Sequence, residues 1–335
     1  MRILVLGGTA FLSAEIARQA AAAGHEVTCL ARGLAVPPPE GSTWLRADRT
    51  TGHQAYEEAE GDWDAVVDVA RDPEQAREAL EALSPRTAHW TVVSSCSVYA
   101  DHSLTGADED AALLRPLARG TALSPENYGE AKSAIEQYAT SIAGGKAHLC
   151  RAGLIGGPGD GSDRYGYWPA RFSRDAEPVI VPAIGPSATQ VIDVRDLAAW
   201  VLTAAGRGIT GALNAVGGGV GFDDYLAESQ RQANYVGRAL AVPEDWLVAR
   251  GIGYWAGPDS LPLWLPPGRD GFAARSNDAA LAAGLRLRPW QDTLRDTLDD
   301  ERRRGLDRDR KAGLSPETER RLLDEFLRGT IPARS

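Results

Sequence analysis

Cysteine and histidine are scarce in this sequence, and their spacing excludes two kinds of site. The three cysteines, Cys29, Cys96 and Cys150, are odd in number and far apart. They imply no disulfide framework and suit a reducing compartment. The five histidines form no His-x-x-x-His or Cys/His cluster, so the sequence predicts no metal site.

Long apolar runs and an excess of basic charge are also absent. No stretch approaches the about 18 consecutive apolar residues of a membrane helix, and the apolar start is too short for a secretion signal. We therefore expect a cytoplasmic protein without a membrane partner. The formal charge of −10 at pH 7 disfavours nucleic acid as a partner, because nucleic-acid binding needs a concentrated basic face. A small-molecule substrate is expected instead, bound by a monomer or a homodimer.

Six short apolar segments in the first half of the chain predict strands. They are residues 2–7, 26–31, 43–46, 65–69, 90–95 and 147–153. Most are apolar on both faces, as in a parallel sheet covered by helices. Helical stretches separate them, beginning with the alanine-rich residues 9–23 that Gly24 closes. This repeated βαβ pattern predicts an α/β fold with a Rossmann-type doubly wound parallel sheet.

The pattern changes after Gly156, where a loop rich in glycine and aspartate begins. Residues 1–157 and 188–221 are predicted to form the dinucleotide-binding domain, with residues 211–216 as a further strand of its sheet. Residues 158–187 and 222–335 are predicted to form a smaller, mostly helical substrate-binding domain. Within it, the mixed-charge residues 299–311 are expected to be a solvated helix face.

A glycine turn follows the first predicted strand directly and opens the first predicted helix. A dinucleotide pyrophosphate binds at such a helix N-terminus, where free N–H groups and the helix dipole attract anions. In the spacing G-x-x-G-x-x-G the chain has Gly7, Ala10 and Ser13, all small enough for a close approach. The alternative is a structural turn that holds no ligand.

The end of the second strand bears on the choice of dinucleotide. NAD-selective sites usually place an acid here for the ribose 2′-hydroxyl, whereas an arginine suits a 2′-phosphate. Ala31 stands at the position of the acid, and Arg32 follows it. The sequence therefore predicts NADP(H) in preference to NAD(H). The alternative is that Arg32 is an ordinary surface residue in a turn.

Tyr128 and Lys132 are four residues apart, and Lys132 is one of only three lysines in the chain. On a helix this spacing places both side chains on one face. A cation 4–5 Å from the phenol is worth about 3–4 kcal/mol at an effective dielectric near 20. We therefore predict that Lys132 lowers the pKa of Tyr128 to about 7–8, where it can exchange protons with a carbonyl or alcohol. The alternative is an incidental surface pair.

The fifth predicted strand ends in hydroxyl-bearing residues. Ligands of open α/β sheets bind beyond the carboxyl ends of the strands, so Ser95 can hydrogen-bond the reacting oxygen beside Tyr128. Cys96, the next residue, is expected to be a small buried residue and not a nucleophile.

Together these elements resemble the extended short-chain dehydrogenase/reductase family, the NAD-dependent epimerase/dehydratase group. The resemblance runs through residues 2–9, 63–68, 94–99, 128–132, 151–158 and 192–198. It implies that Ser95 is the catalytic hydroxyl, that Tyr128 is the acid/base, and that Lys132 also holds the nicotinamide ribose. The cofactor-binding residues that it implies are Gly7, Thr9, Ala10, Phe11, Leu12, Arg32, Asp48 near adenine, Ala70 and Lys132.

Two departures from the family bear on the substrate. Sugar 4,6-dehydratases carry Asp-Glu after the catalytic hydroxyl, where this chain has Cys96 and Ser97. Nucleotide-sugar enzymes tend to carry an Asn where this chain has Leu154. Both departures argue against a nucleotide-sugar dehydratase, and the second also argues against an epimerase. The aromatic segment that follows favours an apolar or ring-bearing substrate. The residues expected to bind the substrate are Ser97, Leu154, Tyr167, Trp168 and Arg171.

The sequence thus predicts an NADP(H)-dependent reductase or dehydrogenase that acts on a carbonyl or alcohol of a small metabolite. Two alternatives remain open. One is a nucleotide-sugar-type epimerase that retains its cofactor, and the other is a dinucleotide-binding scaffold without turnover.

Overall fold

A seven-stranded sheet dominates the computed structural model, which describes residues 1–33 and 36–330. The strands lie in the order β10-β6-β5-β4-β1-β2-β3, and every neighbouring pair is parallel. Their bounds are β1 (Arg2–Leu6), β2 (Glu26–Leu30), β3 (Thr43–Leu45), β4 (Trp63–Asp68), β5 (Thr87–Ser95), β6 (Ala147–Ala152) and β10 (Gly211–Ala215). The predicted Rossmann-type sheet is therefore confirmed, including its late strand after residue 210.

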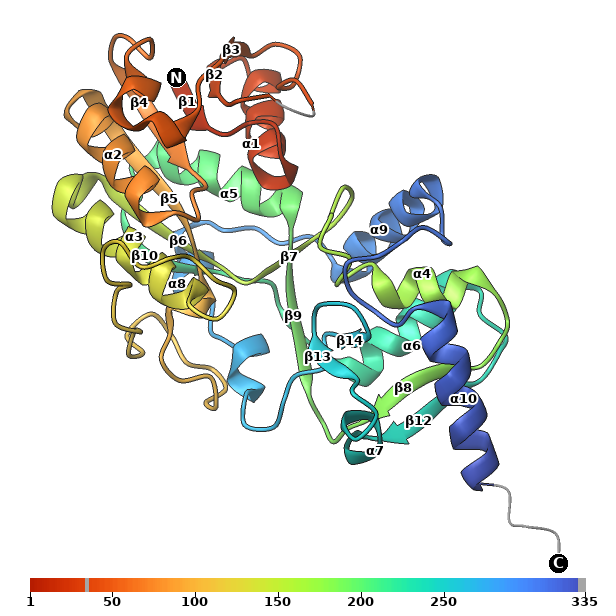
Figure 1. Ribbon diagram of the computed structural model, residues 1–335. Coiled ribbons are helices and arrows are strands. Elements are labelled where there is room, and N and C mark those ends of the chain that lie inside the picture. Colours follow the sequence, from red (N-terminus) through yellow and green to blue (C-terminus); the bar gives the residue numbers. More distant parts are fainter. Residues whose placement is uncertain (34–35, 331–335) are drawn as a thin grey trace, which may run out of the picture.

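Four helices cover the two faces of this sheet (Figure 1). They are α1 (Phe11–Ala22), α2 (Pro73–Leu83), α3 (Tyr128–Ile142) and α5 (Val194–Arg207). On β1, Ile3 and Val5 face a core shared with α1 and α5, whereas Leu4 and Leu6 face a core shared with α2 and α3. Because both faces are buried, the strand is apolar at consecutive positions, as parallel strands usually are.

The order of the strands reverses between β1 and β4. β2 and β3 lie on one side of β1, and β4, β5 and β6 lie on the other. In open α/β sheets the ligand crevice lies outside the carboxyl ends of the strands at this reversal. The segments that follow Leu6, Asp68 and Ser95 therefore meet at the expected position of a ligand.

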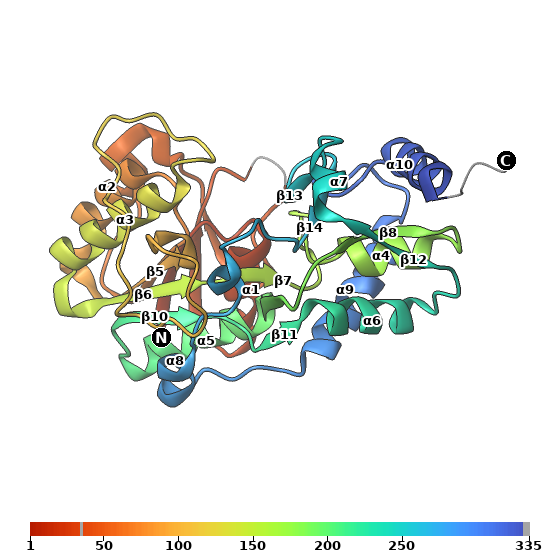
Figure 2. The same ribbon diagram turned by 90° about the horizontal axis from the view of Figure 1, so that it is seen from below.

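The rest of the chain forms a smaller second part beside the sheet (Figures 1 and 2). Its core is aromatic, with Trp168, Phe172, Tyr225 and Trp264 each at most 2% exposed. Its helices are α4 (Tyr167–Arg174), α6 (Phe222–Ala233), α7 (Glu244–Val248), α9 (Trp290–Arg304) and α10 (Pro316–Thr330). Its strands are β8 (Val179–Ala183), β12 (Ala239–Pro243), β13 (Gly253–Trp255) and β14 (Ser260–Pro262). A three-stranded sheet of β11 (Gly219–Gly221), β9 (Ala188–Asp193) and β7 (Leu154–Gly156) contacts both cores, with Ile192 in the core of the first part and Leu154 in the aromatic core.

One helix of the C-terminal sequence returns to the first part. In α8 (Asp278–Ala283), Ala280 is fully buried in the core that α1 and α5 share. The prediction had placed all of residues 222–335 in the second domain. The apolar face of α8 is so short that the sequence pattern does not indicate against which of the two cores it packs.

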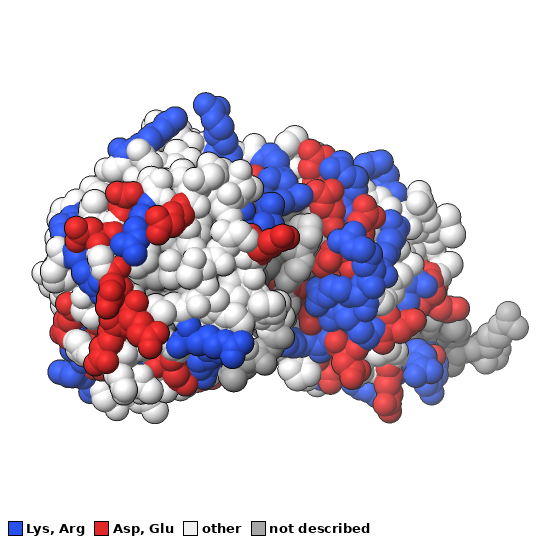
Figure 3. All heavy atoms as spheres, turned by 90° about the horizontal axis from the view of Figure 1, so that it is seen from above, with Lys and Arg blue, Asp and Glu red and all other residues white. Residues whose placement is uncertain are grey.

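The expectation that residues 299–311 form a solvated helix face is wrong. α9 ends at Arg304, and Glu301 on its last turn is only 1% exposed. Arg308 and Arg310, beyond the helix, fold back to within 2.9 and 2.8 Å of the Glu301 carboxylate. Acidic and basic side chains are intermixed over this part of the molecule (Figure 3).

Among the described helices, none has the length and apolarity that a membrane crossing requires.

Candidate active site

The turn between β1 and α1 has the backbone shape of a phosphate cradle. Gly7 and Gly8 have φ angles of +133° and +94°, a region that side chains rarely adopt. A Cβ on Gly8 would collide with the side chain of Cys29, so the turn packs directly against β2. α1 has no side-chain N-cap and no acidic residue in its first turn. Its free N–H groups are therefore available to an anion.

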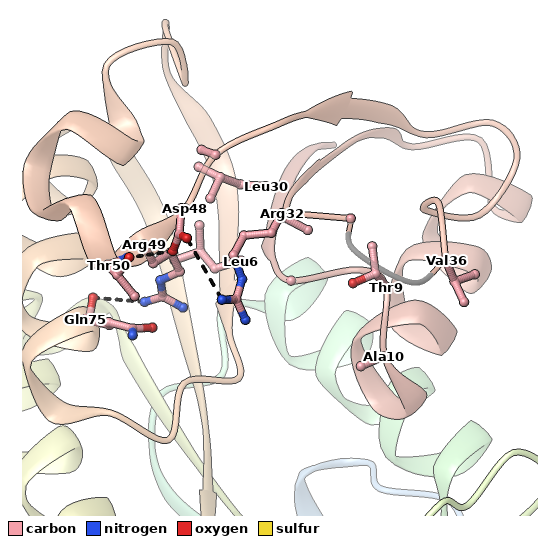
Figure 4. A pocket seen from close by; sticks show the side chains of 14 residues that line it. Leu6, Thr9, Ala10, Leu30, Arg32, Val36, Asp48, Arg49, Thr50 and Gln75 are labelled. Atoms are coloured by element: carbon pink, nitrogen blue, oxygen red, sulfur yellow. Dashed lines mark hydrogen bonds and ion pairs between the residues drawn. The ribbon is translucent and has the colours of Figure 1, made fainter. Parts of the chain in front are cut away.

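A pocket of about 440 Å³ opens beside this turn. Gly7 lines it together with Thr9, Ala10, Arg32 and Asp48 (Figure 4), so the structure brings together five of the predicted cofactor-binding residues. The Arg32 guanidinium lies 3.9 Å from the Asp48 carboxylate, and both side chains are exposed. A hydrogen bond from the backbone N–H of Thr50 lowers the pKa of Asp48, which keeps that carboxylate charged.

Arg49 lines the same pocket, and the sequence analysis missed it. Its guanidinium nitrogens lie 2.7 and 3.0 Å from the two oxygens of the Asp68 carboxylate. Asp68 ends β4, is 1% exposed, and accepts a hydrogen bond from the Ala70 N–H. This buried pair therefore fixes the backbone beside the predicted cofactor residue Ala70. The available signal was an arginine shortly after the third predicted strand, at the carboxyl edge of the sheet where ligands bind.

Lys132 is anchored beneath the reversal of the sheet. Its Nζ donates hydrogen bonds to the carbonyl oxygens of Ala70 at 2.6 Å and Val93 at 2.8 Å. Burial lowers the pKa of Lys132 to about 8, against the opposing influence of the Asp68 carboxylate. Because a protonated ammonium has three donors, one N–H remains for a ligand.

Tyr128 begins α3, and its hydroxyl lies within hydrogen-bonding reach of Ser95 at the end of β5. Ser95 Oγ accepts a hydrogen bond from the Ser97 N–H at 3.1 Å and donates one to Ser97 Oγ, also at 3.1 Å. Lys132 Nζ lies 5.9 Å from the centre of the Tyr128 ring. The structure thus brings together the three predicted catalytic residues and Ser97.

The prediction that Lys132 lowers the pKa of Tyr128 is wrong. Burial raises the pKa of Tyr128 above its ordinary value of 10.0, and the cations that oppose the rise are Arg71 and Arg164. The physical reason is that the ammonium of Lys132 faces the carbonyls of Ala70 and Val93. Tyr128 is therefore held as a neutral phenol at neutral pH.

A buried ion pair supports the site from below. Glu136, one turn beyond Lys132, lies 2.8 Å from Arg151 on β6. Ser94 Oγ donates to the same carboxylate at 2.5 Å, which ties α3 to β5.

Burial raises the pKa of the Cys96 thiol to about 12, so this buried residue is no nucleophile, as expected.

The residues predicted to bind the substrate do not lie together. Ser97 is beside Ser95, but Leu154, Tyr167 and Trp168 are at most 6% exposed in the aromatic core of the second part. Arg171 is also buried, and its guanidinium lies 2.6 Å from Glu319 and 3.0 Å from Asp175. These four side chains therefore serve the packing and ion pairing of the second part.

A residue of the second part that was not predicted for the site acts on Tyr128. Arg164 is a cation near its hydroxyl, and the Arg164 guanidinium lies 5.2 Å from the centre of the Trp255 ring. No cluster of three or more His, Cys, Asp or Glu side chains suited to a metal occurs within residues 1–33 and 36–330.

Comparison with known proteins agrees with this geometry. No curated protein matches the chain. Three solved structures resemble it along nearly their whole length, with sequence identities so low that the likeness is one of fold. TunA, an NAD-dependent NDP-hexosamine 5,6-dehydratase involved in tunicamycin biosynthesis, has a TM-score of 0.67 and 19% identity over 92% of this chain and 99% of its own.

The other two structures are epimerases in complex with NAD. The UDP-glucose 4-epimerase of Thermus thermophilus has a TM-score of 0.60 and 18% identity, over 90% of this chain and 99% of its own. The UDP-glucuronic acid 4-epimerase of Bacillus cereus has a TM-score of 0.62 and 16% identity, over the same shares. A family model described as "NAD dependent epimerase/dehydratase family" matches residues 3–215. The chain belongs to the NAD dependent epimerase/dehydratase family.

Proposed function

We propose that the protein is an NADP(H)-dependent reductase or dehydrogenase that acts on a carbonyl or alcohol of a small metabolite. The observation that carries this proposal is the meeting of Tyr128, Ser95 and Lys132 at the carboxyl edge of the sheet. The hydroxyls of Tyr128 and Ser95 can both reach one substrate oxygen, and Lys132 is anchored directly below them.

The residues at the sheet edge fit a dinucleotide. Gly7, Thr9, Ala10, Phe11 and Leu12 would hold its pyrophosphate at the start of α1. Arg32 and Asp48 would hold the adenosine end, with Ala70 and Lys132 at the nicotinamide end. When bound, the dinucleotide supplies or accepts the hydride.

The protein residues handle the proton and the position of the oxygen. In the reductive direction the phenol of Tyr128 donates its proton to the carbonyl oxygen as the carbon gains hydride, so that C=O becomes CH–OH. In the reverse direction the phenolate takes the hydroxyl proton as the C–H bond breaks. Ser95 hydrogen-bonds the same oxygen throughout. The positive charges of Arg71 and Arg164, which oppose the rise in the pKa of Tyr128, would stabilise the phenolate that Tyr128 becomes in reduction. Lys132 assists by holding the backbone carbonyls of Ala70 and Val93 beside the site.

The preference for NADP(H) depends on Arg32. Ala31 leaves no acid to repel a 2′-phosphate, and Arg32 faces the adenosine pocket. Asp48 offsets part of its charge across 3.9 Å, so the preference requires that Arg32 turn from Asp48 to the phosphate.

The test is a substrate screen that follows NADPH and NADH absorbance with wild-type protein and Tyr128→Phe. Net oxidation of NADPH by a carbonyl compound, lost in Tyr128→Phe, is the expected result. A protein that binds NADPH yet reduces no carbonyl compound and oxidises no alcohol in the screen would contradict the proposal.

A second candidate is an epimerase that retains its cofactor. The fold it shares with two NAD-bound nucleotide-sugar epimerases favours it, whereas the buried Leu154 disfavours a diphosphate at that position. Purified protein that carries tightly bound dinucleotide and inverts a sugar centre without net NADPH consumption would establish this function.

We also propose that the protein works in the cytoplasm as a monomer or homodimer. Its cysteines Cys29, Cys96 and Cys150 are free and buried, which suits a reducing compartment.

A further inference from the structure

The loop between β7 and α4 lies between the two parts of the molecule (Figure 1). A Cβ on Gly159 would stand 3.7 Å from the ring of Phe11 at the start of α1. On its other side, the Gly159 N–H donates to the Asp300 carboxylate of α9 at 2.9 Å. Gly159 therefore lies between the start of α1 in the first part and α9 in the second part.

Asp163 is locked into this loop in an unusual backbone conformation. Its φ is +60°, in the left-handed region that costs a non-glycine residue of order 1 kcal/mol or more. Its carboxylate, 2% exposed, pairs with Arg308 and accepts a hydrogen bond from the Lys311 N–H at 2.9 Å. The chain segment after α9 therefore holds the strained residue in place.

The next residue, Arg164, has a different environment. Its guanidinium lies over the Trp255 ring at 5.2 Å and near the Tyr128 hydroxyl. Trp255 itself has a φ of +67°, so strained backbone occurs at one residue of this contact and directly before the other. Such strain is found where a side chain must be presented in one position.

Arg164 has no carboxylate partner within 4.0 Å in the described part of the chain. The nearby Asp160 carboxylate accepts hydrogen bonds from the N–H and hydroxyl of Ser162, at 2.7 and 2.9 Å, and Arg164 Nε donates to the same Ser162 hydroxyl at 3.3 Å. In contrast, Arg304 and Arg308 are both paired with carboxylates. Burial lowers the pKa of Arg164, and the nearby Asp160 carboxylate opposes this effect only in part.

A second unpaired arginine approaches Tyr128 from the first part. Arg71 follows Ala70 beyond β4, is exposed, and forms no ion pair with any residue that the structure describes. Arg71 and Arg164 therefore act on the hydroxyl proposed to exchange the proton, and neither forms an ion pair within 4.0 Å in the described part of the chain. A planar guanidinium over an aromatic ring is well suited to bind a carboxylate or phosphate.

We propose that Arg164, assisted by Arg71, binds an anionic group of the substrate next to the carbon that exchanges hydride. This inference rests on the proposed function. It narrows the substrate to a carbonyl compound or alcohol that carries a carboxylate or phosphate near the reacting carbon, with Trp255 as the wall of that subsite.

Calorimetry on the NADPH-loaded protein tests this proposal without turnover. Malonate and inorganic phosphate are titrated into wild type, Arg164→Gln, Arg164→Lys and Arg71→Gln. Arg231→Gln is the control, because it also removes one positive charge but lies at an exposed pair with Glu228. We expect one of the two anions to bind wild type and the control at millimolar concentrations, which identifies the anion class. Arg164→Gln should weaken the binding of that anion about 10- to 100-fold and leave NADPH affinity unchanged. Arg164→Lys should weaken anion binding less, because it keeps the positive charge.

Three results would overturn the proposal. They are no binding of either anion to wild type, equal binding to wild type and to both Gln variants of the proposed pair, or a parallel loss of NADPH affinity in Arg164→Gln. The last would assign Arg164 to the cofactor pyrophosphate. If Arg164→Gln does not fold, Arg71→Gln decides, since an exposed side chain is not needed for folding. A protein that binds the anion through Arg164 but turns nothing over would contradict the proposed function alone.

Discussion

Glu136 and Arg151 form an ion pair of 2.8 Å in which each residue is only 4% exposed. The pair joins α3, which carries Tyr128 and Lys132, to the sheet. Its position makes the geometry of the candidate site depend on two buried residues that lie below it.

Glu136→Gln should lower the free energy of unfolding by about 3–5 kcal/mol, because it leaves the Arg151 charge buried without its partner. Urea unfolding measures this loss. Glu228→Gln is the control, since its pair with Arg231 is exposed at the arginine and should be worth less than about 1 kcal/mol. Equal losses in both variants would show that the buried pair has no special role.

Tyr128→Phe should reduce kcat by about 10²–10⁴-fold and leave the Kd of the dinucleotide nearly unchanged, because the hydroxyl moves a proton and binds no cofactor. Steady-state kinetics and calorimetry separate the two quantities. Tyr138→Phe, on the same helix, should match wild type. A wild-type kcat in Tyr128→Phe would remove the acid/base role.

The raised pKa of Tyr128 predicts the pH dependence of each direction. Below its pKa the phenol holds the proton that reduction consumes, so kcat/KM for reduction should stay level through neutral pH and fall only above pH 10. Oxidation requires the phenolate and should become faster as pH rises toward the same pKa. A fall in the reduction rate centred near pH 7 would contradict this assignment.

Lys132 should make the protein more stable as pH rises, in the opposite sense to a lysine whose pKa is raised by an ion pair. Its pKa is about 8 in the folded protein, against an ordinary value of 10.5, so the unfolded chain binds more protons between these values. The penalty for burying the charge is complete below pH 8 and is relieved as pH rises toward 10.5. Lys132→Met should abolish this rise in unfolding free energy, whereas Lys146→Met should keep it.

NADPH should stabilise the protein against heat more than NADH does at equal concentration. A ligand at 100 times its Kd adds about 2.7 kcal/mol to the free energy of unfolding. Arg32→Ala should remove the difference, and Asp48→Asn should increase it because Arg32 loses its competing partner at 3.9 Å. Equal melting shifts with both dinucleotides in wild type would end the NADP(H) assignment.

The sheet could be predicted because each buried strand is apolar at consecutive positions, as β1 shows with Ile3 to Leu6 all buried. The Tyr128/Lys132 pair could also be found, because four residues of helix fix their relation locally. The partners of Arg164 and Asp163 lie about ninety and more than a hundred residues further along the chain. No local pattern contains such contacts. Arg171 is a further example, because the sequence around it does not indicate that it is buried and paired with Glu319.

The pairing of Asp163 with Arg308 has a consequence for the order of events during synthesis. Domains generally fold as the chain emerges, N-terminal first, and all seven strands of the sheet have been made by residue 215. The loop that presents Arg164 must wait for nearly a hundred more residues before Arg308 arrives to hold it. A nascent or truncated chain would therefore be able to bind dinucleotide before it could discriminate among substrates.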